Sequence, residues 1–182
     1  MATNIFDLCT NPVTGETFKA VSLTPYAFTM QWTVQSGRHV PFEHLHVYQD
    51  EIFYVKKGEI KVLVEGKEHI AREGQRVIIT KGKKHAAFNN GEDELNTWVE
   101  YRPPLDQHRL YQCYNGLIND GCLDKNGAVS MPMMCYMLKK MKCKAMARPT
   151  SIPAPLFKLT LNLFYLMGTM KGWDKLYEKY TQ

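Results

Sequence analysis

The sequence predicts a mainly β chain, an antiparallel sandwich or barrel, followed by an α-helical extension. Glycines recur about every eight residues in the middle of the chain, and the runs between them, such as residues 52–55, 60–64 and 77–79, are rich in β-branched and aromatic residues. Short strands separated by turns at this spacing are typical of antiparallel sandwiches and barrels. The recurring glycines are Gly58, Gly66, Gly74, Gly82 and Gly91. After residue 104 the strand signals stop and helical ones begin, so we expect a barrel domain over residues 1–104 and a helical extension over residues 105–182.

An earlier strand is predicted by alternation between apolar and polar residues. Successive side chains on a strand point to opposite faces, so this alternation places the apolar set on one face. The apolar residues are Phe28, Met30, Trp32 and Val34, and the polar residues are Thr29, Gln31, Thr33 and Gln35. A chain of 182 residues, of which 45% are hydrophobic, suits one domain or one domain plus an appendage.

The extension begins with two predicted helices. Residues 105–119 are expected to form the first, which ends near Gly121. Ser130 is placed to cap the second, with Pro132 in its first turn, and this helix is expected to run toward residue 147. Its apolar residues share one stripe at helical spacing, namely Met134, Met137, Leu138, Met141 and Ala145.

A proline-rich linker then leads to a third segment, residues 156–170, that is apolar on most sides, and a short aromatic segment over residues 173–180 closes the chain. The third segment is about fifteen residues long and contains Lys158 and Asn162, whereas a membrane span needs about twenty largely apolar residues. We therefore expect no transmembrane helix.

Charge is distributed unevenly along the chain. The overall balance is +5, but residues 125–173 contain eight Lys or Arg and no Asp or Glu, which leaves 15 basic against 18 acidic residues elsewhere. One interpretation is a basic, Met-rich surface that lies on anionic lipid or binds a partner helix. The favoured interpretation is that the apolar stripes pack on the barrel or across a homodimer while the lysines stay solvated. The basic cluster carries no recognised nucleic-acid-binding module, so we expect no nucleic-acid partner.

The start of the sequence and the cysteines favour a cytoplasmic location. No basic segment followed by an apolar run, as in a secretory signal, is visible at the start. The five cysteines form an odd set without a CxxC pair, which is more typical of reduced thiols than of a disulfide framework. They are Cys9, Cys113, Cys122, Cys135 and Cys143.

Four residues together predict a site for one divalent metal ion. His44 and His46 are two positions apart on a predicted strand, so their side chains project from the same face. Glu51 follows at an odd offset, which requires a bend or bulge before it, and Gln49-Asp50 offers polar residues for one. His85 lies thirty-four residues after Glu51 and completes a set of three imidazoles and one carboxylate.

Glycines and an asparagine stand at regular positions around these ligands. Gly37 precedes the HLH pair, Gly58 follows the glutamate, and Gly82 and Asn89 flank the third histidine. Over roughly residues 30–103 the chain resembles the paired motifs of the cupin superfamily, in which a glycine, HxH and a glutamate are followed by a second glycine and histidine motif. The resemblance implies a double-stranded β-helix, or jelly-roll, barrel with the metal site inside.

The resemblance departs from the usual pattern at two places that are not ligands. Six residues separate Gly37 from the HLH pair where five are commoner, and Thr80 stands where proline is usual. Three imidazoles and one carboxylate suit Fe, Mn, Ni, Zn, Co or Cu, and a six-coordinate ion would keep two positions open for water or a chelating small molecule.

Three functions remain open, since this fold hosts many unrelated activities. The first is a small metal-dependent enzyme, a quercetinase-like dioxygenase or an isomerase, in which Glu43 is a candidate for proton transfer. The second is a non-catalytic protein that binds a metal or small ligand in the same pocket. The third is a barrel that serves as a platform for dimer or membrane-surface contacts of the tail.

Aromatic residues near the ligands are candidates for the wall of the substrate pocket, although ordinary core packing explains them equally well. Phe53 shares a face with Glu51 if the strand is regular. On a later strand Trp98 and Glu100 oppose Thr97, Val99 and Tyr101, and alternation alone leaves open which set points inward. The pocket candidates are Phe42, Phe53, Phe88, Trp98 and Tyr101.

Overall fold

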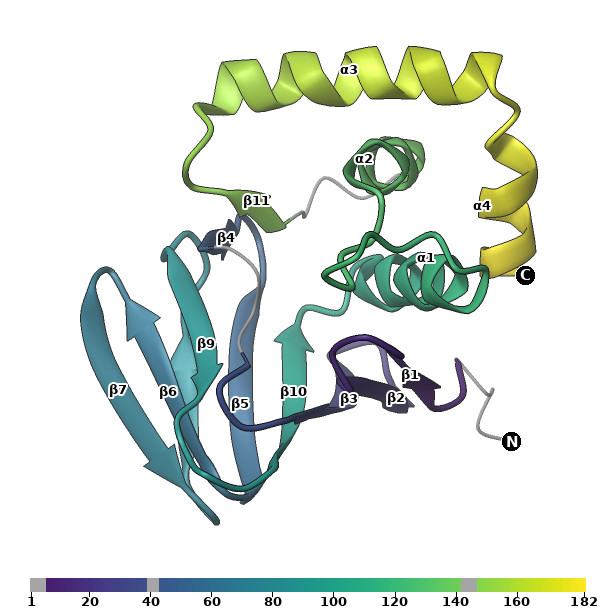
Figure 1. Cartoon of the computed structure of the whole chain (residues 1–182). Helices are drawn as coiled ribbons and strands as arrows, with labels where there is room; N and C mark the ends of the chain where they lie inside the picture. The colour runs from purple at the N-terminus through teal and green to yellow at the C-terminus, as the bar shows by residue number, and fades with distance from the viewer. Residues whose placement is uncertain (1–5, 39–42, 142–146) are drawn as a thin grey trace.

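The computed structural model describes residues 6–38, 43–141 and 147–182. Within these residues the chain forms eleven strands in two antiparallel sheets, together with four helices. The sheets form the walls of a barrel, and the helices gather to one side of it (Figure 1). The predicted order, a double-stranded β-helix barrel and then a helical extension, is confirmed.

Each sheet contains strands that are far apart in the sequence. The six-stranded sheet consists, in spatial order, of β1 (Cys9–Thr10), β2 (Thr17–Leu23), β3 (Phe28–Val34), β10 (Leu95–Arg102), β5 (Asp50–Lys57) and β8 (Arg76–Ile79). The five-stranded sheet consists of β11 (Ala147–Pro149), β4 (His44–His46), β9 (His85–Asn89), β6 (Glu59–Val64) and β7 (Lys67–Arg72). Because β4 and β5 lie in different sheets, the chain crosses from one wall to the other between His46 and Asp50.

Glycine turns connect the strands as the spacing predicts. Gly58 has a φ of +86° between β5 and β6, and an added Cβ would lie 3.1 Å from the carbonyl oxygen of Glu94. In the β6–β7 hairpin, Glu65 and Gly66 have φ values of 51° and 78°, the left-handed pair that suits a two-residue hairpin turn. These positions explain why short strands follow one another at regular intervals.

The barrel core forms between the inward faces of the two sheets. The predicted strand over residues 28–34 is β3, paired with β2 and β10, and its four apolar residues are all buried. They share a core cluster with Phe53 and Val99 of the same sheet and with Ile60 and Val62 of the opposite sheet.

The extension forms four helices whose bounds are close to the expected ones. They are α1 (Gln107–Asn119), α2 (Met131–Lys140), α3 (Ala154–Met170) and α4 (Asp174–Thr181). The second helix is shorter than expected, since it ends at Lys140, and residues 142–146 lie outside the described residues. Strand β11 follows that gap and was not predicted.

Helix α1 covers one end of the chain's own barrel. The Tyr111 ring lies 5.9 Å from the ring of Phe18 and 6.3 Å from that of Phe28, and Ile118 belongs to the barrel core. A second apolar cluster joins the helices to one another and is centred on Cys113, Tyr136, Met137 and Met141. The extension therefore packs on its own barrel through α1 and has a small core of its own.

Helices α2 and α3 approach each other closely at a glycine. A Cβ added at Gly168 of α3 would lie 2.3 Å from Cδ2 of Tyr136 on α2. The ring of Tyr136 also stacks on that of Tyr165, with centroids 5.4 Å apart. None of the helices in the described part of the chain is long and apolar enough to cross a bilayer.

The contact at Gly168 predicts a stability effect. We expect Gly168→Val to lower the free energy of unfolding by about 2–3 kcal/mol, because the larger side chain overlaps the Tyr136 ring and forces α2 and α3 apart. The matched control is Asn162→Val, which places the same β-branched residue at an exposed position of α3 and should cost less than about 1 kcal/mol. Equal midpoints for the two variants in urea denaturation would contradict the close approach.

Candidate metal centre

Three histidines and one glutamate converge inside the barrel. Each of His44, His46, Glu51 and His85 offers one donor atom, and these four atoms all lie within 4.8 Å of one another. Donors on opposite sides of a first-row divalent ion lie about 4.2 Å apart, given bond lengths of about 2.1 Å. The cluster is thus close to the size that one ion requires. All four residues are buried, and His44 is the most exposed, at 8%.

Two neighbouring strands bring the histidines together. His44 on β4 is the register partner of His85 on β9, and their ring centroids are 4.4 Å apart. His46 projects from the same face of β4, and its ring stacks against that of His85 at 5.6 Å. The side chains of His44 and His46 therefore share one face of the strand, as their i, i+2 spacing predicts.

The carboxylate comes from the opposite sheet. Glu51 lies on β5, which the chain reaches after a bend at residues 47–48. The bend thus falls two residues before the predicted Gln49-Asp50 position: Gln49 is buried and Asp50 already begins β5. The bend moves the chain to the other wall of the barrel, so the odd offset of Glu51 does not turn its side chain away from the histidines.

Hydrogen bonds orient His85 for metal binding. Its Nδ1 lies 2.9 Å from the carbonyl oxygen of Lys83, which can only accept, so Nδ1 carries a proton. Its Nε2 lies 2.7 Å from Oε2 of Glu51. When His85 is neutral, this tautomer leaves the lone pair on Nε2, which faces the cluster, the arrangement found for histidines that bind metals in proteins.

The charges of Glu51 and His85 support each other. Burial by itself raises the pKa of Glu51, but attraction to His46 and His85 outweighs it and holds this pKa well below the usual range. Burial lowers the pKa of His85, but its hydrogen bond and attraction to Glu51 outweigh this and raise the pKa. Glu51 is consequently ionised at neutral pH, as a metal ligand must be.

His46 is the residue that hydrogen bonding leaves unexplained. Both ring nitrogens are buried and neither has a hydrogen-bond partner, and Nε2 lies 3.4 Å from Oε2 of Glu51 in an ion-pair contact. Buried polar atoms without partners cost free energy, so their presence at a cluster of donors indicates a ligand there. The residues present fit a single divalent ion.

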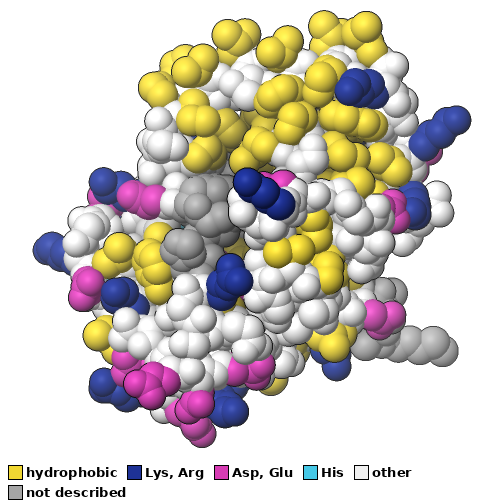
Figure 2. Space-filling view, in the orientation of Figure 1, with side chains coloured by type: hydrophobic (Ala, Val, Ile, Leu, Met, Phe, Trp, Pro, Cys, Tyr) yellow, Lys and Arg dark blue, Asp and Glu magenta, His cyan; other side chains and the backbone are white. Residues whose placement is uncertain are grey.

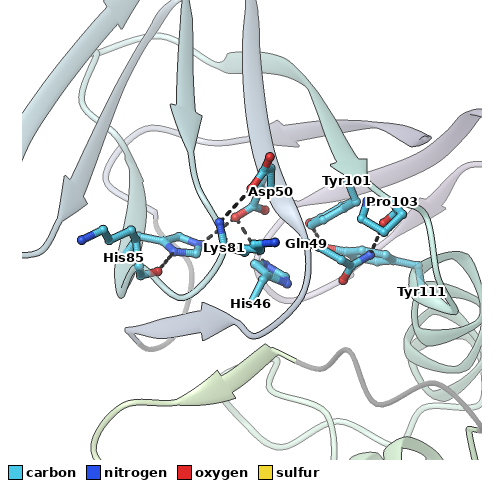
Figure 3. A network of polar contacts seen from close by, with 10 residues as sticks. His46, Gln49, Asp50, Lys81, His85, Tyr101, Pro103 and Tyr111 are labelled. Atoms are coloured by element: carbon cyan, nitrogen blue, oxygen red, sulfur yellow. Dashed lines mark hydrogen bonds and ion pairs between the residues drawn. The ribbon is translucent and has the colours of Figure 1, made fainter. Parts of the chain in front are cut away.

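Backbone contacts hold the end of the crossing that leads into β5. Gln49 Nε2 donates to the carbonyl oxygens of Pro103 and Pro104, at 2.9 and 3.0 Å. Asp50 Oδ1 accepts from the amide of Lys81 at 2.8 Å, and this polar network lies around His46 and His85 (Figure 3). Gln49 was not predicted as a site residue, and its burial beside two ligand strands could not be recognised from the sequence.

Tyr101 is the predicted pocket residue that the structure brings next to the ligands. It faces Glu51 in the β10–β5 register, and its ring centroid lies 5.3 Å from that of His46. Its hydroxyl oxygen is 2.9 Å from the hydroxyl of Tyr111 on α1, so a pair of phenols leads from the cluster to the extension. Burial, with the charge of Glu51, raises the pKa of Tyr101 well above its ordinary value, and the phenol stays neutral. Tyr111 was not predicted, because only the packing of α1 brings it there.

Two of the predicted pocket residues point away from the site. Phe88 is three residues after His85 and lies on the other face of β9, where Lys61 Nζ is 5.6 Å from its ring. Trp98 lies on the outer face of β10, 38% exposed, with Lys56 Nζ 4.0 Å from its ring. The inward set on β10 is the one that contains Val99 and Tyr101. Alternation along each strand is therefore the reason that Phe88 and Trp98 do not reach the ligands.

The other candidates are placed as follows. Phe53 is buried on β5 and packs at 6.1 Å from the ring of Trp32 in the barrel core. Phe42 lies outside the described residues. Glu43 directly precedes β4 and is exposed, and its side chain accepts a hydrogen bond from the hydroxyl of Thr150 at 3.3 Å.

The extension reaches the ligand strand through β11. This strand pairs with β4, so that Ala147 faces His46 and Pro149 faces His44. The amide of Thr150 continues the contact by donating to the carbonyl oxygen of Glu43 at 3.1 Å. Strand β11, Ala147–Pro149, is therefore part of the same sheet as the three histidines.

These features define an antiparallel barrel with a three-histidine, one-glutamate cluster between its sheets. Residues 30–99 match the family described as Cupin domain, so the resemblance noted in the motifs is confirmed over this part of the chain. The extension over residues 105–182 lies outside the match. No curated protein matches the chain in sequence.

Several solved structures are similar to the chain. KdgF from Halomonas sp. is 24% identical, with 51% of this chain and 83% of that chain covered and a TM-score of 0.48. The cupin domain of Cnp3 from Schizosaccharomyces pombe is 14% identical, with 53% and 68% covered and a TM-score of 0.47. A cupin-superfamily sugar phosphate isomerase from Silicibacter pomeroyi is 18% identical, with 50% and 61% covered and a TM-score of 0.45.

The contact between Glu51 and His85 predicts that the pKa of His85 changes when Glu51 is replaced. In metal-free protein we expect Glu51→Gln to lower the pKa of His85, because burial is then no longer outweighed by a neighbouring carboxylate. NMR titration of the histidine ring protons measures this pKa. Glu43→Gln is the control and should leave the pKa of His85 raised, since Glu51 is retained. An unchanged His85 titration in Glu51→Gln would show that the contact does not exist in solution.

Proposed function

We propose that this protein binds one divalent transition metal ion through His44, His46, Glu51 and His85 and acts as a small metal-dependent enzyme on a small organic molecule. The observation that carries the proposal is the buried cluster itself, in which His46 has no hydrogen-bond partner while its neighbours are oriented around it. A purely structural polar cluster would also give the ring nitrogens of His46 a hydrogen-bond partner. A metal site leaves them directed at a common centre.

The donor set selects a class of ion. Three imidazoles and one carboxylate suit Fe, Mn, Ni, Zn, Co or Cu, whereas Ca²⁺ and Mg²⁺ prefer oxygen ligands. When bound, such an ion would supply Lewis-acid or redox chemistry at coordination positions that the four protein ligands do not fill. This supports the dioxygenase or isomerase type of reaction.

Residues around the cluster have separate parts in the proposed function. Lys83 fixes the tautomer of His85 through its carbonyl oxygen. Ionised Glu51 would offset the positive charge of the bound ion in the buried site. Tyr101 contributes a neutral phenol beside His46, and a neutral phenol can donate a hydrogen bond to an oxygen atom of a small molecule. Phe53 belongs to the apolar core of the barrel, and this core would exclude water from the side of the site where Phe53 lies.

One observation supports the alternative, a non-catalytic protein that binds a metal or small ligand. Glu43, the candidate for proton transfer, is exposed and bonded to Thr150 rather than to the metal cluster. A general acid or base must come within hydrogen-bond reach of the reacting group. Turnover therefore decides between the two functions.

The first test is metal content. Protein purified without chelator, or reconstituted, should contain about one equivalent of a single transition metal by elemental analysis. We expect His46→Ala to lower metal affinity by at least about 100-fold, because one of the four protein ligands is removed. His69→Ala, which removes an exposed histidine of β7, is the matched control and should bind as the unaltered protein does. Less than about a tenth of an equivalent after reconstitution would exclude the metal site.

The second test separates enzyme from binder. If the protein is a dioxygenase, its Fe- and Mn-loaded forms should consume O₂ with at least one member of a panel of flavonols, catechols and diketones. If it is an isomerase, NMR should detect isomeric products instead. We expect Tyr101→Phe to lower turnover by about 10- to 100-fold with metal content unchanged, because one donor near the cluster is lost. Tight binding of one compound without turnover would favour the binder instead.

A further inference from the structure

Helix α3 exposes a row of large apolar side chains on the face that points away from the molecule. The row consists of Leu156 (53% exposed), Leu159 (63%), Leu163 (61%), Leu166 (61%) and Met170 (81%). Figure 1 places α3 at the edge of the molecule farthest from the sheets, and Figure 2 shows hydrophobic side chains gathered over this region. We refer to these five residues as the α3 row.

Packing on the opposite side of α3 prevents the row from turning inward. Phe157 and Gly168 are buried, and Gly168 lies against the Tyr136 ring with no room for a Cβ. Tyr165 stacks on the same ring. Rotation of the helix about its axis would break these contacts and expose Phe157, so the row remains on the surface of the single chain.

The spacing of the α3 row is that of a coiled-coil seam. Its members are separated by three, four, three and four residues, which corresponds to the a and d positions of successive heptads. On an α-helix they span an arc of about 80°, narrower than the stripe of roughly 100° or more by which a helix covers a protein core. The row therefore fits one partner helix lying along it.

The charge of the residues beside the α3 row indicates whether a helix or a lipid surface covers the row. Thr160, Asn162 and Thr169 border the row and are uncharged, and Lys158 is the only charged residue in α3. A helix that lies on anionic lipid has a wide apolar face bordered by several Lys or Arg. The net positive charge of the segment comes mostly from residues outside α3. Uncharged flanks let two identical helices approach without repulsion, which favours a second copy of this chain.

We propose that the α3 row docks on the α3 row of a second copy, so that the protein is a homodimer held by a symmetric helix pair. Each Leu or Met contributes roughly 100 Å² of apolar surface, so two rows bury about 1,000 Å² in total, near the lower limit for a specific interface. Leu163 is the middle member of the row. In an antiparallel pair it lies nearest the two-fold axis, and in a parallel pair each member of the row faces its own counterpart, so Leu163 meets Leu163 of the second copy in both cases.

Sedimentation velocity tests the proposal on the full chain. At about 50 µM the unaltered protein should be dimeric, and Leu163→Glu should be monomeric, because each copy would bring a charge to the two-fold axis. Leu8→Glu removes a leucine of equal exposure from the N-terminal segment and should remain dimeric. Circular dichroism should give the same spectrum for all three proteins, since Leu163 is exposed in the single chain.

Mixing two variants tests whether the row meets itself. Leu163→Lys alone should also be monomeric, and an equimolar mixture of the Leu163→Lys and Leu163→Glu proteins should recover dimer, because opposite charges then face each other. A monomeric unaltered protein, a dimeric Leu163→Glu protein or a mixture that stays monomeric would each overturn the proposal. So would a monomer that binds vesicles of phosphatidylglycerol and loses this binding in Leu163→Glu, which would assign the row to a lipid surface.

Discussion

A single buried carboxylate connects the two walls of the barrel at the metal centre. Glu51 projects from one sheet toward three histidines on the other, and its Oε2 lies 2.7 Å from Nε2 of His85. An ionised carboxylate in the interior is tolerated only when positive charge or hydrogen-bond donors compensate it. This requirement explains the surrounding structure: the β4–β9 register, the crossing at residues 47–48 and the Lys83 carbonyl all bring imidazole nitrogens to that carboxylate.

Features that depend on local periodicity could be predicted from the sequence, and those that depend on distant pairing could not. The HLH pattern, the glycine turns and β3 follow from two-residue alternation and turn chemistry. Phe88 and Trp98 were only candidates for the pocket wall, with the inward face of the later strand left open, and strand alternation places both on the outer faces of their strands. Tyr111 and β11 approach the site from helical parts of the chain, so only the folded structure shows them.

The extension connects the site to the outer surface in two ways. Through Tyr111 it supplies the second hydroxyl of the phenol pair, and through β11 it supplies a backbone partner for the ligand strand. Beyond β11, residues 150–153 lead directly into α3. The strand that carries two of the histidines and the helix of the proposed dimer are therefore joined by one short segment, residues 147–153.

The pairing of β11 with β4 also bears on solubility during folding. Without β11, the strand that carries His44 and His46 would form the open edge of its sheet, next to the cluster of three histidines and Glu51. Open edges of this kind recruit strands from other molecules, and natural proteins cover them. On a ribosome, β10 ends at Arg102, and 44 further residues are made before β11 begins at Ala147. The nascent chain thus passes through a stage in which this strand edge is unprotected, and the extension acts as a covalently attached cap that ends this stage.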